Sequence, residues 1–286
     1  MPRILITGCG YVGEATADLF HRAGWQVEGW VHSAESAARL STRPYPVFGV
    51  DISNPTRVAG RGSNFDYVML AASSRGGKSD AYRRTYFNGA SNLLNRFAGT
   101  RILFTSSTSV YAQRDGSWVT EESETKPRHK TARILLETER LVLAGGGIVA
   151  RLAGIFGPGR SALLSKFLAG SAVIDPQNDR FVNQVHRDDV ASALFLLLDR
   201  QSTAGEIYNV VDDQPILRSE CYHWLAKKFS RPLPSIGTST ANSKRGASNK
   251  RVSNAKLRRL GWSLRYPTFA EAMEKSILPS FVEPSA

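Results

Sequence analysis

The sequence predicts an α/β fold in which a doubly wound parallel sheet is joined to a smaller C-terminal lobe. The first observation is the order of elements, because short apolar runs alternate with helical spacing over the first half of the chain. The second is the start of the chain, where an apolar run leads directly into a glycine-rich turn. Such alternation is typical of parallel strands that helices cover on both faces.

The first element is an apolar strand that begins at residue 3 and runs into Gly-x-Gly-x-x-Gly at Gly8, Gly10 and Gly13. Gly8 permits a tight turn, Gly10 lets the backbone approach a pyrophosphate, and Gly13 lets the next helix pack closely on the strand. Tyr11 and Val12 complete the turn, and we expect all five residues to contact a dinucleotide. The turn therefore predicts a Rossmann-type fold; the alternative is a glycine turn without a cofactor.

The following elements continue the alternation. We expect strands over residues 26–31, 46–50, 67–72, 101–105 and 147–151, and helices most clearly over 80–97 and 131–143. A glycine- and proline-rich run at 154–159 then ends the alternation, a helix follows His186 to about residue 199, and a strand covers 206–211. These elements predict a dinucleotide-binding domain over 1–155, to which 187–211 returns. Residues 156–186 and 212–286 then form the substrate lobe, with a mobile loop over 235–250.

The end of the second strand indicates which dinucleotide is bound. In this fold a carboxylate at that tip binds the ribose hydroxyls of NAD, whereas cations or hydroxyls accept the 2′-phosphate of NADP. His32 and Ser33 stand there, so we expect NADP, with NAD as the alternative; Arg39 or Arg43 could assist. Asp51 and Ile52 end the third strand, where the acid can accept from the adenine amino group or cap the next helix.

Composition narrows the class of protein. The chain has 286 residues, a net charge of +12 and two cysteines, too few for a disulfide scaffold or a Cys-based zinc site, and no metal is expected. No charged leader or membrane-spanning run is evident, so we expect a cytoplasmic location. Residues 231–270 hold nine Lys and Arg without one Asp or Glu. This segment favours a small anionic substrate, although a solvated basic face explains it equally well.

Three further motifs resemble those of a known family. They are Phe104-Thr105-Ser106-Ser107-Thr108-Ser109-Val110-Tyr111, the segment from Arg151 to Gly159, and Val185-His186-Arg187-Asp188-Asp189-Val190. With the glycine turn, they resemble the extended or atypical short-chain dehydrogenase/reductases, the NAD(P)-dependent epimerase/dehydratase group, over nearly the whole chain. The resemblance implies a catalytic hydroxyl four residues before Tyr111, at Ser107, which would hydrogen-bond the substrate oxygen while hydride moves. A capping role for Ser107 is the alternative. We also expect cofactor contacts from Ala71, Ala72, Ser73, Ser106, Ala153 and Gly154.

The resemblance also implies a catalytic Tyr-x-x-x-Lys pair, and the expected window at 126–137 contains no tyrosine. His129 and Arg133 have i, i+4 spacing there, so the imidazole is one candidate acid/base, since it titrates near neutral pH. The alternative is a solvated helical turn in which Arg133 contacts the cofactor. Tyr86 and Tyr111 are the remaining candidate phenols, and His186 is expected to be structural.

Three functions remain open at this point. The first is an oxidoreductase or isomerase that acts by hydride transfer on a nucleotide-linked sugar or a similar polar anionic metabolite. The second is a non-catalytic NADP(H)-binding sensor, which the missing Tyr-x-x-x-Lys pair favours, because loss of an acid/base costs about 10² to 10⁴ in rate. Nucleic-acid binding ranks last, since the chain lacks an aromatic stacking pattern. We expect a monomer or a homodimer.

Overall fold

The computed structural model describes residues 1–62, 64–74, 76–127, 129–238 and 248–281. Its centre is a seven-stranded sheet in the order β12-β7-β5-β4-β1-β2-β3, with every neighbouring pair parallel. The strands are β1 Arg3–Thr7, β2 Gln26–Val31, β3 Val47–Gly49, β4 Tyr67–Leu70, β5 Arg101–Ser107, β7 Ile148–Leu152 and β12 Ile207–Val210. The predicted doubly wound α/β fold is confirmed.

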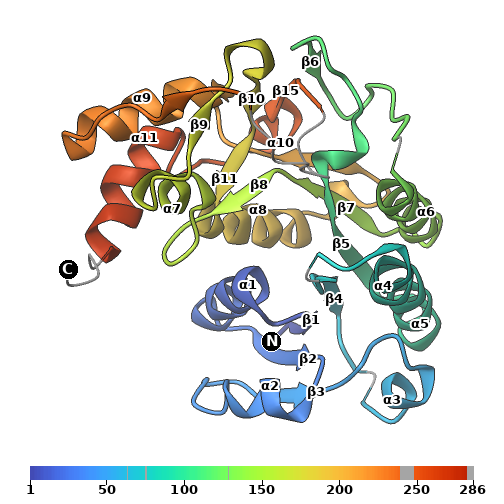
Figure 1. Cartoon of the computed structure of the whole chain (residues 1–286). Helices are drawn as coiled ribbons and strands as arrows, with labels where there is room; N and C mark the ends of the chain where they lie inside the picture. The colour runs from blue at the N-terminus through green and yellow to red at the C-terminus, as the bar shows by residue number, and fades with distance from the viewer. Residues whose placement is uncertain (63, 75, 128, 239–247, 282–286) are drawn as a thin grey trace.

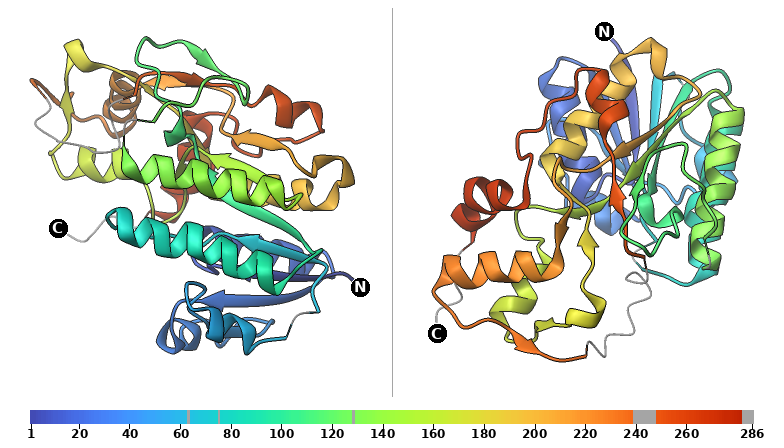
Figure 2. Two further views of the ribbon diagram at one scale, coloured as in Figure 1. Left: turned by 90° about the vertical axis from the view of Figure 1, so that its right-hand side faces the viewer. Right: turned by 90° about the horizontal axis from the view of Figure 1, so that it is seen from above.

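Helices cover both faces of this sheet (Figure 1). α1 Tyr11–Arg22 and α8 Arg187–Asp199 pack together on one face, while α5 Gly89–Arg96 and α6 Lys130–Ala144 lie side by side on the other, as the left view of Figure 2 also shows. Two short helices, α2 Ala34–Ala38 and α3 Pro55–Ala59, follow β2 and β3. The central strands β1 and β4 are largely apolar because both their faces are buried.

The helix expected over 80–97 differs from a regular α-helix. It begins as α4 Ser79–Tyr82, widens into a π-helical stretch at Arg83–Asn88, and continues as α5. Wide turns of this kind are uncommon and frequently occur at functional sites.

The rest of the chain builds a second, smaller group of elements beyond the carboxyl ends of the strands (Figure 1). It contains β6 Trp118–Val119, β8 Gly154–Phe156, α7 Ala162–Leu168, β9 Val173–Ile174, β10 Phe181–Val182, β11 Gln184–His186, β13 Ile216–Leu217, α9 Arg218–Phe229, β14 Ser235–Ile236, β15 Arg251–Val252, α10 Ala255–Arg259 and α11 Phe269–Ala272. A π-helical turn at Met273–Ile277 and a 3₁₀ turn at Leu278–Ser280 follow α11; other 3₁₀ turns are Thr108–Val110, Pro176–Asn178 and Gln201–Thr203.

The described residues form two hydrophobic clusters, and the larger one also takes in Val119, Val185, Val252 and Leu257 of β6, β11, β15 and α10. The larger surrounds the sheet, and the smaller joins α7, α9 and α11 through Phe167, Leu225 and Phe269. We refer to the elements around the smaller cluster as the C-terminal lobe. The loop expected over 235–250 is wrong at its start, because Ser235 and Ile236 form β14 beside β9; residues 239–247 lie outside the described residues.

Candidate functional site

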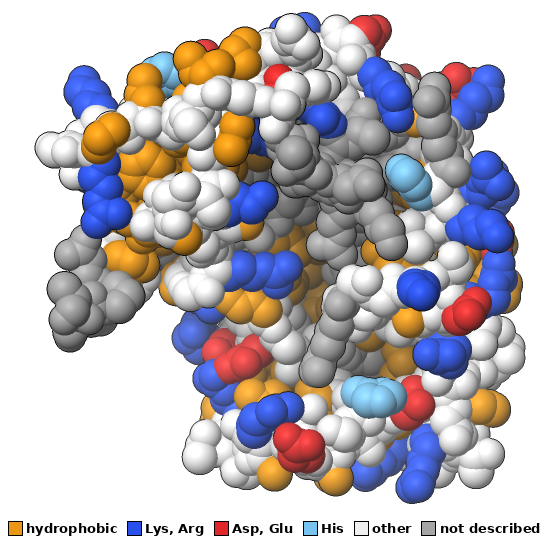
Figure 3. Space-filling view, viewed as in Figure 1, with side chains coloured by type: hydrophobic (Ala, Val, Ile, Leu, Met, Phe, Trp, Pro, Cys, Tyr) orange, Lys and Arg blue, Asp and Glu red, His pale blue; other side chains and the backbone are white. Residues whose placement is uncertain are grey.

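A large cleft lies between the carboxyl edge of the sheet and the C-terminal lobe. Its volume is about 1270 Å³, and it extends from the glycine turn past the ends of β2, β3, β4 and β5 to residues 180–183 and 248–250. Figure 3 shows the molecule hollowed at this place, with Lys and Arg side chains around the opening. Ligands of open α/β sheets bind beyond the carboxyl ends of the strands, so the cleft is the candidate functional site.

The glycine turn forms one end of the cleft. Gly8 has φ +85°, and a Cβ there would lie 2.2 Å from the backbone nitrogen of Ala72. A Cβ on Gly13 would lie 2.3 Å from the Gly8 carbonyl oxygen, so Gly13 serves the packing of α1 and does not line the cleft. A Cβ on Gly10 would meet no atom within 4 Å.

This turn fits the pyrophosphate of a dinucleotide. Gly10 is the N-cap residue of α1 and no side chain caps this helix end. The first amides of a helix have no partner within it, and its N-terminus carries partial positive charge. The open space at Gly10 therefore lies against a helix end that suits an anion.

The end of β2 lies near the same turn. The His32 side chain is three-quarters exposed, and its Nδ1 lies 3.8 Å from Asp51 Oδ1. Ser33 is absent from the cleft lining; its hydroxyl instead accepts from the Ser36 amide and caps α2. Arg39 lines the cleft, whereas Arg43 pairs with acids on α1.

Asp51 does not cap the following helix, which was one expectation. Its Oδ1 accepts from the amide and the hydroxyl of Ser53, while Asn54 caps α3. The other expected cofactor contacts that line the cleft are Gly8, Gly10, Tyr11, Val12, Ile52, Ala71, Ala72, Ser73, Ser106, Ala153 and Gly154.

Ser107 lies at the middle of the cleft, where β5 ends beside Leu152 of β7. Its hydroxyl accepts from the Ser109 amide at 3.2 Å, so the capping interpretation holds, and the side chain also lines the cleft. The adjacent Ser106 is buried and donates to Glu139 Oε1 at 2.5 Å. Only the second of the two serines is therefore available to a substrate.

The other candidate catalytic residues differ in how they meet the cleft. Tyr86 comes from the π-helical turn and lines the cleft, with its hydroxyl accepting from the Ser74 amide at 3.4 Å. Tyr111 is 1% exposed, and its hydroxyl is held between Arg151 and Asn209, which disfavours a role in proton transfer. Burial raises its pKa further.

The expected pairing of His129 and Arg133 on one helical face is not present. His129 precedes α6 with extended backbone, and it lines the cleft. Arg133 is exposed, lines a separate hollow beside Pro127, and donates to the Pro127 carbonyl. Arg133 therefore cannot take the cofactor contact expected for it, because α6 turns it away from the large cleft.

The residues of α6 that do face the cleft are Thr131, Ala132 and Leu135. Thr131 and Leu135 have the i, i+4 spacing at which a tyrosine and a lysine would form the implied catalytic pair. A threonine hydroxyl and an apolar side chain replace them. The sequence did not indicate these two positions, because neither carries a residue type of the implied pair. Which side of α6 faces the cleft is evident only from the structure.

The far end of the cleft is cationic. Arg114, Arg180 and Arg218 line it, and the pKa of Arg180 is lowered by burial and by repulsion from Arg218 and Arg114. Among the described lining residues the only carboxylates are Glu14 and Asp51, at the dinucleotide end. Asp175 opposes this repulsion at Arg180 but does not line the cleft, so the three guanidinium groups are suited to bind an anion.

These arginines are not the basic segment that the sequence singled out. Within that segment, Lys256 pairs with Glu206, and Arg258 lies 3.7 Å from Asp213. Among the described basic residues of this segment, only Lys250 lines the cleft. Lys244 and Arg245 lie outside the described residues. Arg114, Arg180 and Arg218 gave no signal in the sequence, because each is isolated among uncharged or mixed neighbours.

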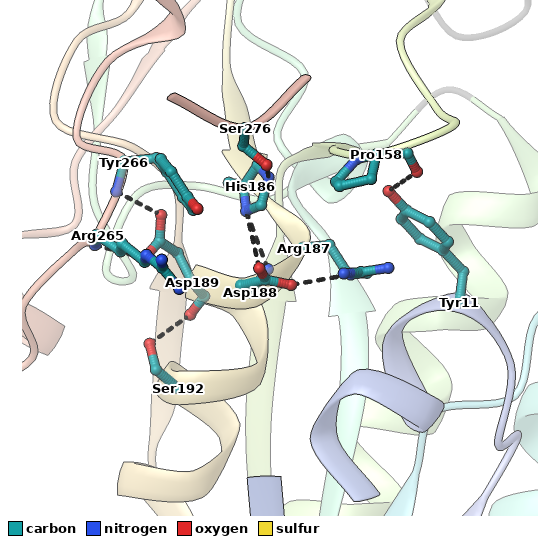
Figure 4. A network of polar contacts seen from close by, with 10 residues as sticks. All are labelled: Tyr11, Pro158, His186, Arg187, Asp188, Asp189, Ser192, Arg265, Tyr266 and Ser276. Carbon is teal, nitrogen blue, oxygen red and sulfur yellow. Dashed lines mark hydrogen bonds and ion pairs between the residues drawn. The ribbon is translucent and has the colours of Figure 1, made fainter. Parts of the chain in front are cut away.

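A polar network joins the sheet to the C-terminal lobe beside the cleft (Figure 4). Tyr11 donates to the Pro158 carbonyl at 3.0 Å, and its ring lies about 5 Å from both Arg160 and Arg187. His186 is fully buried and contacts Ser276 through Nε2 at 3.0 Å. The network thus links the glycine turn and the first residues of α8 to the C-terminal lobe.

Burial changes the titration of two groups in this network. It lowers the pKa of His186 to about 4, against the opposing effect of Asp188. It raises the pKa of Asp189 to about 6, although the Asp189 carboxylate accepts from the amides of Arg265 and Tyr266. The His186 side chain also accepts from the Asp188 amide, which confirms its expected structural role as the N-cap of α8.

Comparison with known proteins agrees with this geometry. Residues 4–210 match the model of the NAD dependent epimerase/dehydratase family. The chain belongs to this family. The resemblance inferred from the motifs is confirmed, and with it a coarse assignment to NAD-dependent, epimerase-like proteins.

This chain is also similar to individual proteins over nearly its whole length. Protein YeeZ of Escherichia coli strain K12 is 29% identical over 93% of this chain and 97% of its own length. A Methylobacillus flagellatus protein, described as a candidate NAD-dependent epimerase/dehydratase, is 26% identical, with a TM-score of 0.79 over 98% of both chains. MoeE5, solved in complex with UDP-glucose and NAD, shares the fold at 21% identity, with a TM-score of 0.79 over 95% of this chain and 96% of its own. In the part of the chain that the structure describes, no helix is long and apolar enough to cross a membrane.

Proposed function

We propose that this protein is an NADP-dependent oxidoreductase or epimerase that acts by hydride transfer on a nucleotide-linked sugar or a similar anionic metabolite. The observation that carries the proposal is the cleft itself, which joins a dinucleotide turn at one end to Arg114, Arg180 and Arg218 at the other. Its volume of about 1270 Å³ exceeds that of most small-molecule sites, so a dinucleotide and a second ligand can share it.

Each part of the cleft has a task in this proposal. The amides that follow Gly10 bind the dinucleotide pyrophosphate, and Ser107 hydrogen-bonds the carbonyl or hydroxyl oxygen of the substrate. The three arginines bind the phosphate groups of the substrate and thereby orient its sugar toward Ser107. The dinucleotide, when bound, supplies or accepts the hydride at its nicotinamide ring.

The related fold of MoeE5 supports the choice of substrate class, because that protein was solved with UDP-glucose and NAD. NADP is proposed over NAD for this chain from the β2 tip, where His32 is exposed, Arg39 lines the cleft and no carboxylate follows the strand directly. Glu28 is not available to a ribose, since it lies within β2 and accepts from Trp30 Nε1 at 2.7 Å.

The proposal is tested in two steps. Calorimetry measures the affinities for NADP and NAD, and a clearly tighter NAD would overturn the cofactor preference. Nucleotide sugars are then screened for a change in nicotinamide absorbance.

Arg180→Ala tests the substrate end. It is expected to raise the KM of an active substrate about 10- to 100-fold, because a hydrogen bond to a charged group is lost. Its affinity for NADP should stay within about twofold, since the arginine lies at the other end of the cleft. The matched control is Arg22→Ala, which removes the same charge from an exposed position of α1. An equal change in KM for the two variants would contradict the proposed substrate site.

A second function is favoured by one specific observation. Thr131 and Leu135 stand on α6 where an acid/base pair is implied, so the chain could bind NADP(H) as a sensor without turnover. Tight NADP binding with no hydride transfer to any nucleotide sugar would favour this sensor function over the enzyme.

A further inference from the structure

Lys250 is a buried lysine on the wall of the cleft. It is 5% exposed, whereas lysines are almost never buried without a partner of opposite charge. Its Nζ donates to Ser248 Oγ at 2.8 Å, and no described carboxylate forms an ion pair with it. Lys228, Lys256 and Lys275 each pair with a glutamate. Lys250 is thus set apart from these surface lysines by both burial and partner.

The backbone holds this residue firmly in place. The Lys250 carbonyl accepts from Asn183 Nδ2 at 2.9 Å, and Asn183 Oδ1 accepts from the Val252 amide at 2.7 Å. On the other side, the Asn249 amide donates to the Gln113 carbonyl at 2.9 Å, and β15 pairs with β6. Residues 249–252 are therefore clamped between the loop that follows β5 and the connection between β10 and β11.

The same connections bring Lys250 toward the reacting centre. Gly154, whose amide donates to the Asn183 carbonyl, lies two residues beyond Leu152, and Leu152 pairs with Ser107. Ser107, Gly154, Asn183 and Lys250 all line one cleft. Lys250 and Ser107 thus belong to the wall of the same cleft, and hydrogen bonds through Asn183 and Gly154 link their segments.

The arginines near this wall do not exchange protons near neutral pH. Arg114 lies in the loop after β5, Arg180 precedes β10 and Arg218 begins α9. The guanidinium groups of these three residues stay protonated. His129, which directly precedes α6, also lines the cleft. For Lys250, burial lowers the pKa to about 8, a range in which an amine can both give and take a proton.

We propose that Lys250 is the acid/base residue that exchanges a proton with the reacting oxygen of the substrate, in place of the absent tyrosine and lysine pair. This inference rests on the proposed hydride-transfer function. In reduction, the carbonyl carbon receives a hydride from a reduced nicotinamide dinucleotide and the π electrons of C=O move to oxygen. That oxygen takes a proton from the Lys250 ammonium, so a C–H and an O–H bond form, an N–H bond breaks, and solvent returns the proton to the amine. Oxidation follows the same steps in reverse.

Activity of variants tests the proposal first. Lys250→Met keeps the length of the side chain and removes its proton; we expect kcat to fall on the order of 10² or more. Lys250→Arg keeps the charge but exchanges no proton, so it should not restore activity. NADP affinity should stay within about twofold in both variants, and Lys228→Met, outside the cleft, should leave kcat unchanged. Restoration by Lys250→Arg would overturn the proposal, because charge alone would then be sufficient.

A second measurement does not depend on turnover. Lysines of the wild-type protein are reductively methylated with ¹³C-formaldehyde and their methyl signals are followed by NMR as pH rises. The Lys250 signal, assigned by its loss in Lys250→Arg, should titrate well below the ordinary lysine value of about 10.4. A midpoint at that ordinary value would overturn the proposal.

The two proposals fail in different ways. A wild-type protein that exchanges no hydride with any nucleotide sugar or similar anionic metabolite would refute the proposed function and this role of Lys250 with it. A wild-type protein that is active, together with a Lys250→Met variant within threefold of its kcat, would refute the role of Lys250 alone.

Discussion

A buried ionic network fixes the residues beneath the candidate site. Arg151 donates to both carboxylate oxygens of Glu139, with distances of 2.7 to 3.2 Å, and to the Tyr111 hydroxyl at 2.9 Å. Ser106 donates to the same carboxylate, and Tyr111 donates to Asn209. β5, α6, β7 and β12 are thereby tied together directly under Ser107. These residues hold the strand ends in position, and the network engages the hydroxyls of Ser106 and Tyr111.

We expect Arg151→Met to cost about 3–5 kcal/mol of unfolding free energy, because it leaves the Glu139 carboxylate buried without its partner. This is a large part of the roughly 5–15 kcal/mol that stabilises a typical domain. Denaturant titration measures the loss. The double variant with Glu139→Met removes the orphaned charge as well and should recover part of the stability. A double variant that is less stable than Arg151→Met would contradict this account.

Ser107→Ala should lower kcat on the order of 10², because it removes a hydrogen bond made to the reacting oxygen of the substrate. Its NADP affinity should hardly change. Ser106→Ala is the matched comparison: its hydroxyl binds Glu139, so this variant should lose stability and keep the kcat of its folded fraction. Steady-state kinetics and thermal unfolding of both variants check the contrast, and equal kinetic effects would count against it.

At the scale of elements, the glycine turn combines three different demands in six residues. Gly8 adopts a backbone conformation that other residues rarely take, Gly13 admits the backbone of Gly8, and Gly10 leaves open space. The first two are requirements of folding, and only the third concerns the ligand. A single sequence motif therefore reports on both stability and binding.

Gly10→Val should fold and lose both dinucleotides by at least about 100-fold in affinity, since the side chain enters the space next to the helix amides. Calorimetry with NADP and NAD measures the loss, with circular dichroism as the check on folding. Gly13→Val is the control: its side chain would meet the Gly8 carbonyl, so this variant should be destabilised as well. Retained binding by a folded Gly10→Val protein would remove the assignment of the turn.

Much of the fold could be predicted from the sequence, and particular residues show why the site could not. The strands are apolar because both faces are buried, and the glycine turn has a fixed spacing, so both are local signals. Arg180 and Arg218 come together only through the pairing of β10 with β13, and Lys250 through the clamp at Asn183. No local pattern encodes such encounters. The cofactor contact expected of Arg133 was wrong for a related reason. A shift of one residue along a helix changes which side the side chain faces, and Arg133 faces the separate hollow.

At the scale of the whole molecule, the junction between the sheet and the C-terminal lobe is where pH should act. His186 and Asp189 lie at the start of α8 and contact Ser276, Arg265 and Tyr266 of the C-terminal lobe. Their pKa values move in opposite directions, so their contributions to stability oppose each other as pH changes. The unfolding free energy of the wild type therefore changes less with pH than these two opposing contributions do separately.

His186→Asn should separate these slopes while keeping a residue suited to cap α8. Between pH 4 and 6.5 the unfolded histidine binds a proton that the folded one does not, because the folded pKa is about 4 against 6.5. Its contribution therefore makes stability rise with pH across this window. The unfolding free energy of the wild type, less that of the variant, should increase from pH 4 to 6.5. A constant difference would contradict the assignment. Asp189 contributes the opposite slope, from about pH 4 to 6, in both proteins.

The order in which the chain returns to the sheet has a consequence for its synthesis. α8 packs on α1, and β12 completes the sheet beside β7. Both elements are translated only after residues 153–186, which run from the sheet to the C-terminal lobe (Figure 1). A nascent chain that has reached Leu152 thus exposes the edge of β7 and one face of α1, which are surfaces prone to aggregation. The dinucleotide-binding half cannot mature before the ribosome has made most of the protein. A chaperone that shields nascent chains would bind these exposed surfaces during this stage of synthesis.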